Sequence, residues 1–170
     1  MNKAQKGFAL IELILYVGIC AFMLFVIFMF ISQILESRVK GQTIAEVEQQ
    51  GDWAVQVITQ AIRNSVSPIN SPTAGSSASS LSLKMTDGTK NPTIFTLSSG
   101  AITISEGGAG AVSLTNSNII ISSLTFQNLT RSGTKGDIEF SFTAAYNNQN
   151  NTSQEFNYSK TFYATASVRY

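Results

Sequence analysis

The sequence predicts an α+β fold in which one long N-terminal helix packs on an antiparallel β-sheet head. Residues 13–31 contain no charged or amide side chain. Beyond them, apolar residues recur at helical steps as far as Ser67, and from Leu81 onward apolar and polar residues alternate with a period of two. The chain has 170 residues, of which 44% are apolar. This composition is too apolar for a disordered chain, and the length suits one domain with an appendage.

The composition also excludes several kinds of active site. The chain has no histidine and one cysteine. It therefore cannot form a Ser/His/Asp or Cys/His nucleophile pair, a histidine-ligated metal site, an intramolecular disulfide or a CxxC site. We expect a protein that is not an enzyme, with no catalytic residue, no metal and no cofactor. The formal net charge of +1 does not favour nucleic acid as a partner.

Residues 13–31 form the predicted membrane segment. As a helix these 19 residues cover about 28 Å, against a hydrocarbon core of about 30 Å. Lys3 and Lys6 precede the segment, while Glu36, Arg38 and Lys40 form a mixed cluster after it. The positive-inside bias therefore predicts a single-pass protein of the inner, or cytoplasmic, membrane with its N-terminus in the cytoplasm and its head outside.

Glu12 does not fit an ordinary membrane anchor, because it directly precedes the apolar run. A carboxylate near the middle of a bilayer costs about 3 kcal/mol on insertion scales and less near the interface, so such a group is usually paired or functional. Two interpretations remain open from the residues alone: Glu12 has a charged partner, or it lies at the headgroup level and is tolerated there.

Two common kinds of N-terminal signal fit poorly. A secretory signal peptide needs a small-residue cleavage site after the apolar stretch, and residues 32–36 do not contain one. A lipoprotein signal would have to use Cys20, but Ile19 stands where a small residue should precede the modified cysteine. Both alternatives are therefore disfavoured.

The remaining pattern is a short basic leader, then Gly-Phe, then an apolar helix with one glutamate. Residues 6–13 read Lys-Gly-Phe-Ala-Leu-Ile-Glu-Leu. This stretch resembles the processing signal of type IV prepilins and pseudopilins, with Ala9 in place of the usual threonine. The resemblance implies that prepilin peptidase, a membrane-embedded aspartyl protease, cuts after Gly7 and that Phe8 becomes an N-methylated amino terminus. It also implies an assembly role for Glu12, whose carboxylate would neutralise the Phe8 amine of an adjacent subunit.

The same resemblance implies a pilin-like fold and a structural function. The chain would be a minor subunit of a type IV pilus or of a type II secretion pseudopilus, similar to minor pilins or J/W-type minor pseudopilins. Its partners would be other pilin or pseudopilin subunits, prepilin peptidase, the inner-membrane assembly platform and membrane lipid. It would move from the membrane into the filament. Two alternatives stay open: a membrane-anchored extracytoplasmic binding domain, and a competence-pilus subunit in DNA uptake.

The chain before the β-rich part divides into a leader at residues 1–7, a transmembrane and assembly helix at residues 8–35, and an amphipathic continuation at residues 36–67. In the continuation, apolar residues recur at steps of three and four: Ile44, Val47, Ala54, Ile58, Ala61 and Ile62. Gly41 and Gly51 predict some bending or local melting, and Pro68 predicts the stop. Trp53 is expected in the core.

Residues 68–80 form a predicted Ser/Pro/Ala/Gly linker, and residues 81–170 form the predicted β head. Alternation, interrupted by turns at Asp87-Gly88 and Ser99-Gly100, predicts successive hairpin strands. The residues expected on the inner face are Leu81, Leu83, Met85, Phe95, Leu97, Ile102, Ile104, Ile120, Leu124, Phe126, Ile138, Phe140, Phe142, Ala144, Phe162, Ala164, Ala166 and Val168.

Three polar stretches of the head could suggest chemistry. The Gly-rich residues 106–110 lack the Lys-Ser/Thr and the helix of a phosphate loop, so we expect a hairpin loop there. Asp137 and Glu139 lie on one face of a strand, and we expect that face to be solvated. Residues 146–157 are rich in Asn and Gln, which predicts a loop between two strands.

Overall fold

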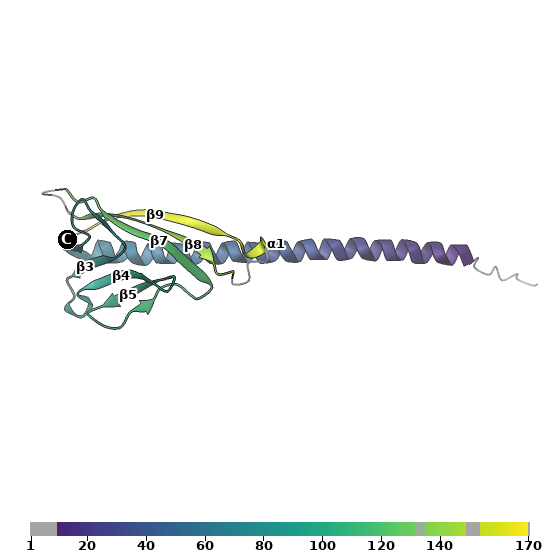
Figure 1. Cartoon of the computed structure of the whole chain (residues 1–170), viewed down its shortest axis with the longest axis horizontal. Coiled ribbons are helices and arrows are strands. Elements are labelled where there is room, and N and C mark those ends of the chain that lie inside the picture. Colours follow the sequence, from purple (N-terminus) through teal and green to yellow (C-terminus); the bar gives the residue numbers. More distant parts are fainter. Residues whose placement is uncertain (1–9, 132, 134, 149–153, 170) are drawn as a thin grey trace, which may run out of the picture. The chain divides into compact units, whose positions relative to one another are not determined.

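The structure is a computed structural model that describes residues 10–131, 133, 135–148 and 154–169. It divides into two compact units, Met1–Lys40 and Gly41–Tyr170. Within the described residues it contains the α-helix α1 (Leu10–Asn64) and two antiparallel sheets. The predicted α+β class is confirmed, and the single sheet expected from the sequence is replaced by two. Figure 1 labels strands of both sheets beside the C-terminal part of α1.

The part of α1 that belongs to the head has one buried stripe. Its buried residues recur at steps of three and four, as a helix with one covered face requires: Thr43, Val47, Gly51, Ala54, Ile58 and Ile62. Four of the six predicted residues belong to this stripe, whereas the other two, Ile44 and Ala61, are half-buried at its margin. The amphipathic continuation of the helix is therefore confirmed.

The helix ends at Asn64, three residues before the predicted end at Ser67. Pro68 is not the stop, because strand β1 (Ser65–Ser71) begins directly after the helix. The last turn of a helix leaves carbonyl groups that need partners. Here the Ser65 hydroxyl donates to the Ile62 carbonyl at 2.7 Å, and the Arg169 N–H donates to the Arg63 carbonyl at 3.3 Å. Contacts from outside the helix therefore set its end.

The local melting predicted at the glycines is wrong, since α1 is helical through both Gly41 and Gly51. Gly51 is buried, and a Cβ atom at this position would overlap the ring of Phe162. Nothing lies within 4 Å of the corresponding position at Gly41. Gly51 thus allows an aromatic ring of the sheet to approach the helix backbone.

The predicted linker over residues 68–80 contains strand residues instead. β1 pairs with β3 (Leu81–Met85) at the edge of the first sheet, and the short β2 (Ser77–Ala78) pairs with β7 (Ile119–Asn128) at the edge of the second. Pro68 lies within β1, a position compatible with proline because an edge strand does not need every N–H for pairing. This stretch therefore contributes an outer strand to each sheet.

The first sheet has the strand order β1-β3-β4-β5-β6. Its further strands are β3 (Leu81–Met85), β4 (Thr93–Ser98), β5 (Ala101–Glu106) and β6 (Val112–Ser113). Asp87 caps the short 3₁₀ helix η1 (Gly88–Lys90) by accepting the Thr89 N–H. At Ser99 and Gly100, φ is 51° and 75°, as a two-residue hairpin turn with the right-handed twist requires. The hairpin strands predicted over residues 81–104 are confirmed, but Leu97, which was predicted on the inner face, is exposed.

The second sheet has the strand order β2-β7-β8-β9. It is formed mainly by β7 (Ile119–Asn128), β8 (Asp137–Tyr146) and β9 (Ser159–Ser167). The predicted inner face of β8 is confirmed, since Ile138, Phe140, Phe142 and Ala144 are buried. The 3₁₀ helix η2 (Gln154–Phe156) lies in the connection between β8 and β9.

One inner-face prediction in β7 is wrong. Ile120 is 44% exposed, while its neighbours Ile119 and Ile121 are buried. Ser123 has a φ of 56°, and the pairing with β8 shifts register between Ser122 and Thr125. The extra residue of this bulge reverses the alternation, so Leu124 and Phe126 point inward as predicted and Ile120 does not.

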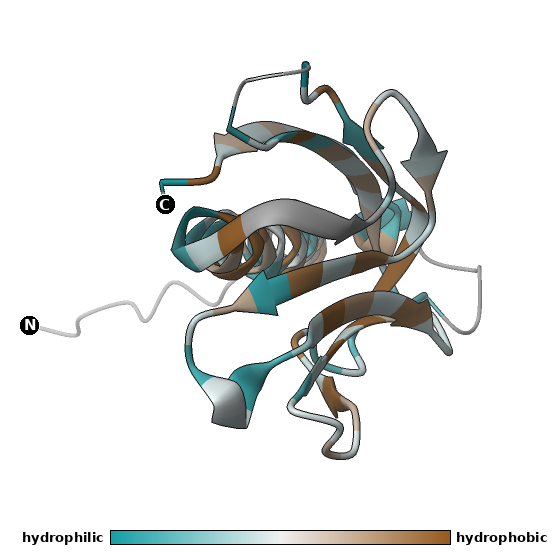
Figure 2. Ribbon diagram, turned by 90° about the vertical axis from the view of Figure 1, so that its left-hand side faces the viewer, coloured by the Kyte–Doolittle hydropathy of each residue, from teal (hydrophilic) through white to brown (hydrophobic). Residues whose placement is uncertain are grey.

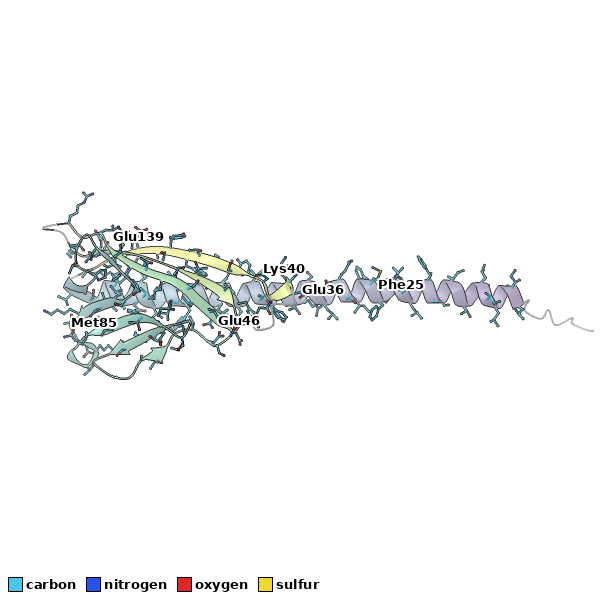
Figure 3. The ribbon with its side chains drawn as sticks, in the orientation of Figure 1. Phe25, Glu36, Lys40, Glu46, Met85 and Glu139 are labelled. Carbon is cyan, nitrogen blue, oxygen red and sulfur yellow. The ribbon has the colours of Figure 1, made fainter. Side chains whose placement is uncertain are left out.

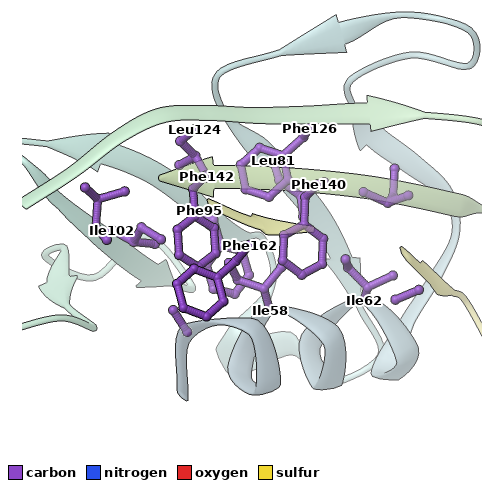
Figure 4. Close-up of a cluster of buried hydrophobic side chains, with 14 of the residues drawn as sticks. Ile58, Ile62, Leu81, Phe95, Ile102, Leu124, Phe126, Phe140, Phe142 and Phe162 are labelled. Carbon is purple, nitrogen blue, oxygen red and sulfur yellow. The ribbon is translucent and has the colours of Figure 1, made fainter. Parts of the chain in front are cut away.

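The helix and the two sheets share one hydrophobic core. In Figure 2 the strands curve around the C-terminal part of α1, and hydrophobic residues recur along them. Figure 4 shows aromatic side chains of both sheets gathered over Ile58 and Ile62. The rings of Phe142 and Phe162 stack with centroids 5.3 Å apart. Because both sheets bury their inner faces against the same helix, residues 41–169 have a core of their own.

Candidate functional site

The predicted processing site lies outside the described residues. Gly7 and Phe8 both belong to residues 1–9, whereas α1 is described from Leu10. The cut after Gly7 and the N-methylation of Phe8 therefore stay predictions. The structure describes Glu12, the other predicted assembly residue.

Glu12 lies in the first turn of α1 as described and is exposed. Its neighbours along the chain, Ile11 and Leu13, are exposed apolar residues. Among the residues that the structure describes, the ion pairs Lys90–Glu106 and Lys160–Glu48 do not involve Glu12. Glu12 is therefore a carboxylate on an apolar helix, and neither of these ion pairs of the described residues neutralises it.

The surface around Glu12 is apolar over a long distance. We define the apolar segment as residues 10–35 of α1, in which every large hydrophobic side chain is exposed. A window of this helix is long and apolar enough to cross a membrane, and none of that window is buried in the structure. A core helix of a water-soluble protein would be mostly buried. Monomeric soluble proteins rarely expose apolar patches larger than a few hundred Å², so this segment needs lipid or protein around it.

The polar groups of the apolar segment are few. The Ser32 hydroxyl donates to the Phe28 carbonyl at 3.0 Å, which satisfies it within the helix. Cys20 is exposed among apolar neighbours. The charged residues Glu36 and Lys40 follow the segment, and Figure 3 labels both together with Phe25. Glu12 is thus the one ionisable carboxylate within residues 10–35.

An ion pair links the helix to the second sheet in the head. Lys160 of β9 donates to the Glu48 carboxylate of α1 at 2.8 Å, and the Tyr158 hydroxyl lies 3.5 Å from the same oxygen. The hydrogen bond from Lys160 and its positive charge lower the pKa of Glu48. The same hydrogen bond raises the pKa of Lys160. Both groups are partly exposed, so this pair positions β9 along the helix and adds little to stability.

The polar stretches in which the sequence could suggest chemistry lie in a loop and on a strand of the head. Residues 107–111 connect β5 to β6 as the predicted hairpin loop, and Gly107 lies against the Thr89 backbone with a φ of 60°. Asp137 and Glu139 lie on the same face of β8 and are half-buried. Across residues 10–131, 133, 135–148 and 154–169, no group of three or more His, Cys, Asp or Glu residues lies together as a metal site would require.

The prediction that Trp53 lies in the core is wrong, because its side chain is 53% exposed. It lines a cleft between α1 and the segment that follows β6. The helical spacing already contained a signal for this, because Trp53 directly precedes Ala54 of the buried stripe and so lies about 100° away from it. The other wall, residues 113–116, could not be assigned to this cleft from the sequence, because it is distant along the chain.

The structure thus defines a class of protein: an α+β head with its own core and an N-terminal helix whose apolar segment is exposed. No protein-family model, curated protein or solved structure matches the chain.

Proposed function

We propose that this chain is a structural subunit of a type IV pilus or a related secretion pseudopilus, assembled through its N-terminal helix. The observation that carries the proposal is Glu12, one carboxylate on an exposed apolar segment of membrane-span length. The motif of residues 6–13, which resembles the prepilin processing signal, supports the same function. The head has a core of its own, so it would stay folded while its helix moves from the membrane into a filament.

The physical role of Glu12 follows from the cost of two isolated charges. Cleavage after Gly7 would create a positive amine at Phe8 in apolar surroundings, and the Glu12 carboxylate of a neighbouring subunit would neutralise it. Such pairing removes the cost of burying either charge alone. It would also fix the register between neighbouring helices, because only one offset brings the amine and the carboxylate together.

A membrane-anchored extracytoplasmic binding domain is the second candidate, and the cleft beside Trp53 is the observation that favours it. Such a protein would use the apolar segment only as an anchor. A minor subunit of the J or W type, or of a competence pilus, would differ from this candidate in requiring Glu12. Whether the protein needs the Glu12 side chain therefore distinguishes the two functions.

The test is the substitution Glu12→Ala in the native host, with Glu36→Ala as the matched control on the same helix. Removing one half of a buried pair costs about 3–5 kcal/mol, so the Glu12 variant should be strongly reduced in sheared filaments or in crosslinks to other subunits. Its level in the membrane should stay unchanged, because an isolated apolar helix inserts as well without the carboxylate. The Glu36 variant should assemble normally.

Intact-mass analysis of the membrane-bound protein provides the accompanying measurement. A mature chain beginning at Phe8, with the mass of one added methyl group, is expected for both variants and for the unaltered chain. Retention of residues 1–7, or normal recovery of the Glu12 variant in filaments, would favour the simple anchor instead.

A further inference from the structure

The cleft beside Trp53 lies wholly within the head and is independent of the apolar segment. It has a volume of about 680 Å³, within the range of about 300–1,000 Å³ usual for small-molecule sites. One wall is α1, which contributes Gln49, Trp53 and Gln56 at helical steps of four and three. The other wall is residues 113–116, at and after β6. Two elements distant along the chain thus form one concave surface.

The second wall is fixed in place by hydrogen bonds. The Leu114 N–H donates to the Ile102 carbonyl at 2.8 Å, and the Ser113 hydroxyl donates to the Thr115 carbonyl at 2.7 Å. Glu46 of α1, labelled in Figure 3, accepts the side-chain amide of Asn116 at 2.9 Å and that of Asn118 at 2.9 Å. This carboxylate therefore ties the wall to the helix, and the cleft is preformed.

Thr115 belongs to the second wall, but its hydroxyl group is buried beneath the surface of the cleft. Its side chain lines the cleft and is only 6% exposed. Among the residues that the structure describes, the Thr115 hydroxyl is the buried side-chain group without a hydrogen-bond partner. Buried polar groups are nearly always paired, since an unpaired one has lost its water without compensation. This oxygen has less than 1 Å² of exposed surface, so a ligand in the cleft does not reach it, and the side-chain amides of the lining supply the polar contacts instead.

We propose that this cleft binds a neutral oligosaccharide. Its lining joins one large exposed aromatic ring to side-chain amides and hydroxyls, with Gln49, Gln50, Gln56 and Asn116 around Trp53. A pyranose ring presents C–H groups on its faces, which pack on an indole, and hydroxyl groups at its rim, which exchange hydrogen bonds with amides. An amide offers both a donor and an acceptor, as a hydroxyl requires.

Other occupants fit this chemistry less well. A protein partner would be expected to meet a more apolar centre, whereas Leu114 is the one aliphatic side chain in the lining. A nucleic acid would need basic side chains for its phosphates, but the lining contains no lysine or arginine and includes the carboxylate of Asp52. The absence of a cationic group also disfavours an acidic sugar.

The test uses the full chain in a detergent without a sugar headgroup. Trp53 is the only tryptophan of the sequence, so indole fluorescence reports on this cleft alone. Cellotetraose, chitotetraose and maltotetraose are titrated in turn. We expect at least one of them to shift the emission to shorter wavelength in a saturable way and to protect the indole from acrylamide quenching.

Variants assign the effect to the cleft, with binding measured by calorimetry. Trp53→Ala should weaken binding about tenfold by removing the stacking ring. Gln56→Ala removes one exposed side-chain amide of the lining and should weaken binding about fivefold by removing one hydrogen bond. The matched control is Tyr163→Ala, which removes a ring of β9 that is 72% exposed and absent from the cleft, and it should bind normally.

The proposal would be overturned by no response to any of the three sugars, by equal weakening in the Tyr163 variant, or by unchanged binding in the Trp53 variant. Concentration-dependent protection of Trp53 without any sugar would also overturn it and would make the cleft an interface between copies. Filament assembly is not part of this measurement, so its result is independent of the function proposed for the apolar segment.

Discussion

The two compact units contain the same kinds of apolar side chain in opposite environments. In residues 10–35 the large apolar side chains all face outward, Phe25 among them. In residues 41–169 the side chains of Phe95, Phe126 and Phe140 are fully or almost fully buried. Removing apolar surface from water is favourable in both cases. The head achieves this internally, whereas the apolar segment depends on a surrounding membrane or on other helices.

The largest expected effect comes from truncating one aromatic ring in each unit. Phe140→Ala should lower the free energy of unfolding of the head by about 3–5 kcal/mol, because it leaves a cavity in the shared core. Phe25→Ala, its matched counterpart in the apolar segment, should leave the unfolding of the head unchanged. Chemical denaturation of the full chain in detergent, followed by near-ultraviolet circular dichroism, measures both. Similar losses in the two variants would show that the two units do not unfold independently.

A smaller effect, with opposite signs, is expected from two glycines of the same helix. Gly51→Ala should destabilise the head by about 1–3 kcal/mol, since its new methyl group would overlap the Phe162 ring. Gly41→Ala has open space around it and should stabilise the helix by up to about 1 kcal/mol through helix propensity. Thermal unfolding of the two variants provides the comparison. A stabilising Gly51 variant would mean that the Phe162 ring can move aside at little cost.

The smallest effect is a pH dependence of the link between α1 and β9. The pKa of Glu48 is lowered in the folded protein, so the ion pair stabilises the head above the ordinary glutamate value of about 4.3 and loses this contribution as the pH falls through the folded value. The raised pKa of Lys160 keeps that contribution intact until strongly alkaline pH. The melting temperatures of unaltered chain and Glu48→Gln should differ slightly at neutral pH and converge in acid.

Lys160→Gln serves as the control for this pair. It should lower the melting temperature by the same small amount as Glu48→Gln, and the double variant should add no further loss, because either substitution alone removes the interaction. Additive losses at neutral pH would show that the two side chains act separately.

Much of the fold could be predicted because local patterns repeat. The alternation in β8 reports its buried face directly, and the Ser99-Gly100 turn identifies the hairpin between β4 and β5. The uncharged residues 13–31 likewise define the apolar helix without reference to any neighbour. Each of these features depends on residues close together in the chain. The position of Glu12 directly before this uncharged run is equally local.

The tertiary structure alone decided the features that depend on distant neighbours. The helix ends at Asn64 because Ser65 pairs with Met85 of β3, and the strands of the predicted linker exist only because each finds a partner. The bulge at Ser123 reverses the face of Ile120, although the residues before it keep their alternation.

Gly51 and Trp53, two residues apart in the sequence, also have surroundings that the sequence could not predict. The sequence determined that both lie on one amphipathic helix, but it did not determine that the ring of Phe162 would cover Gly51. Nor did it determine that residues 113–116 would stand beside Trp53 and form a cleft with it. The physical reason is that periodicity specifies which residues share a face of an element, whereas burial depends on which other element packs against that face.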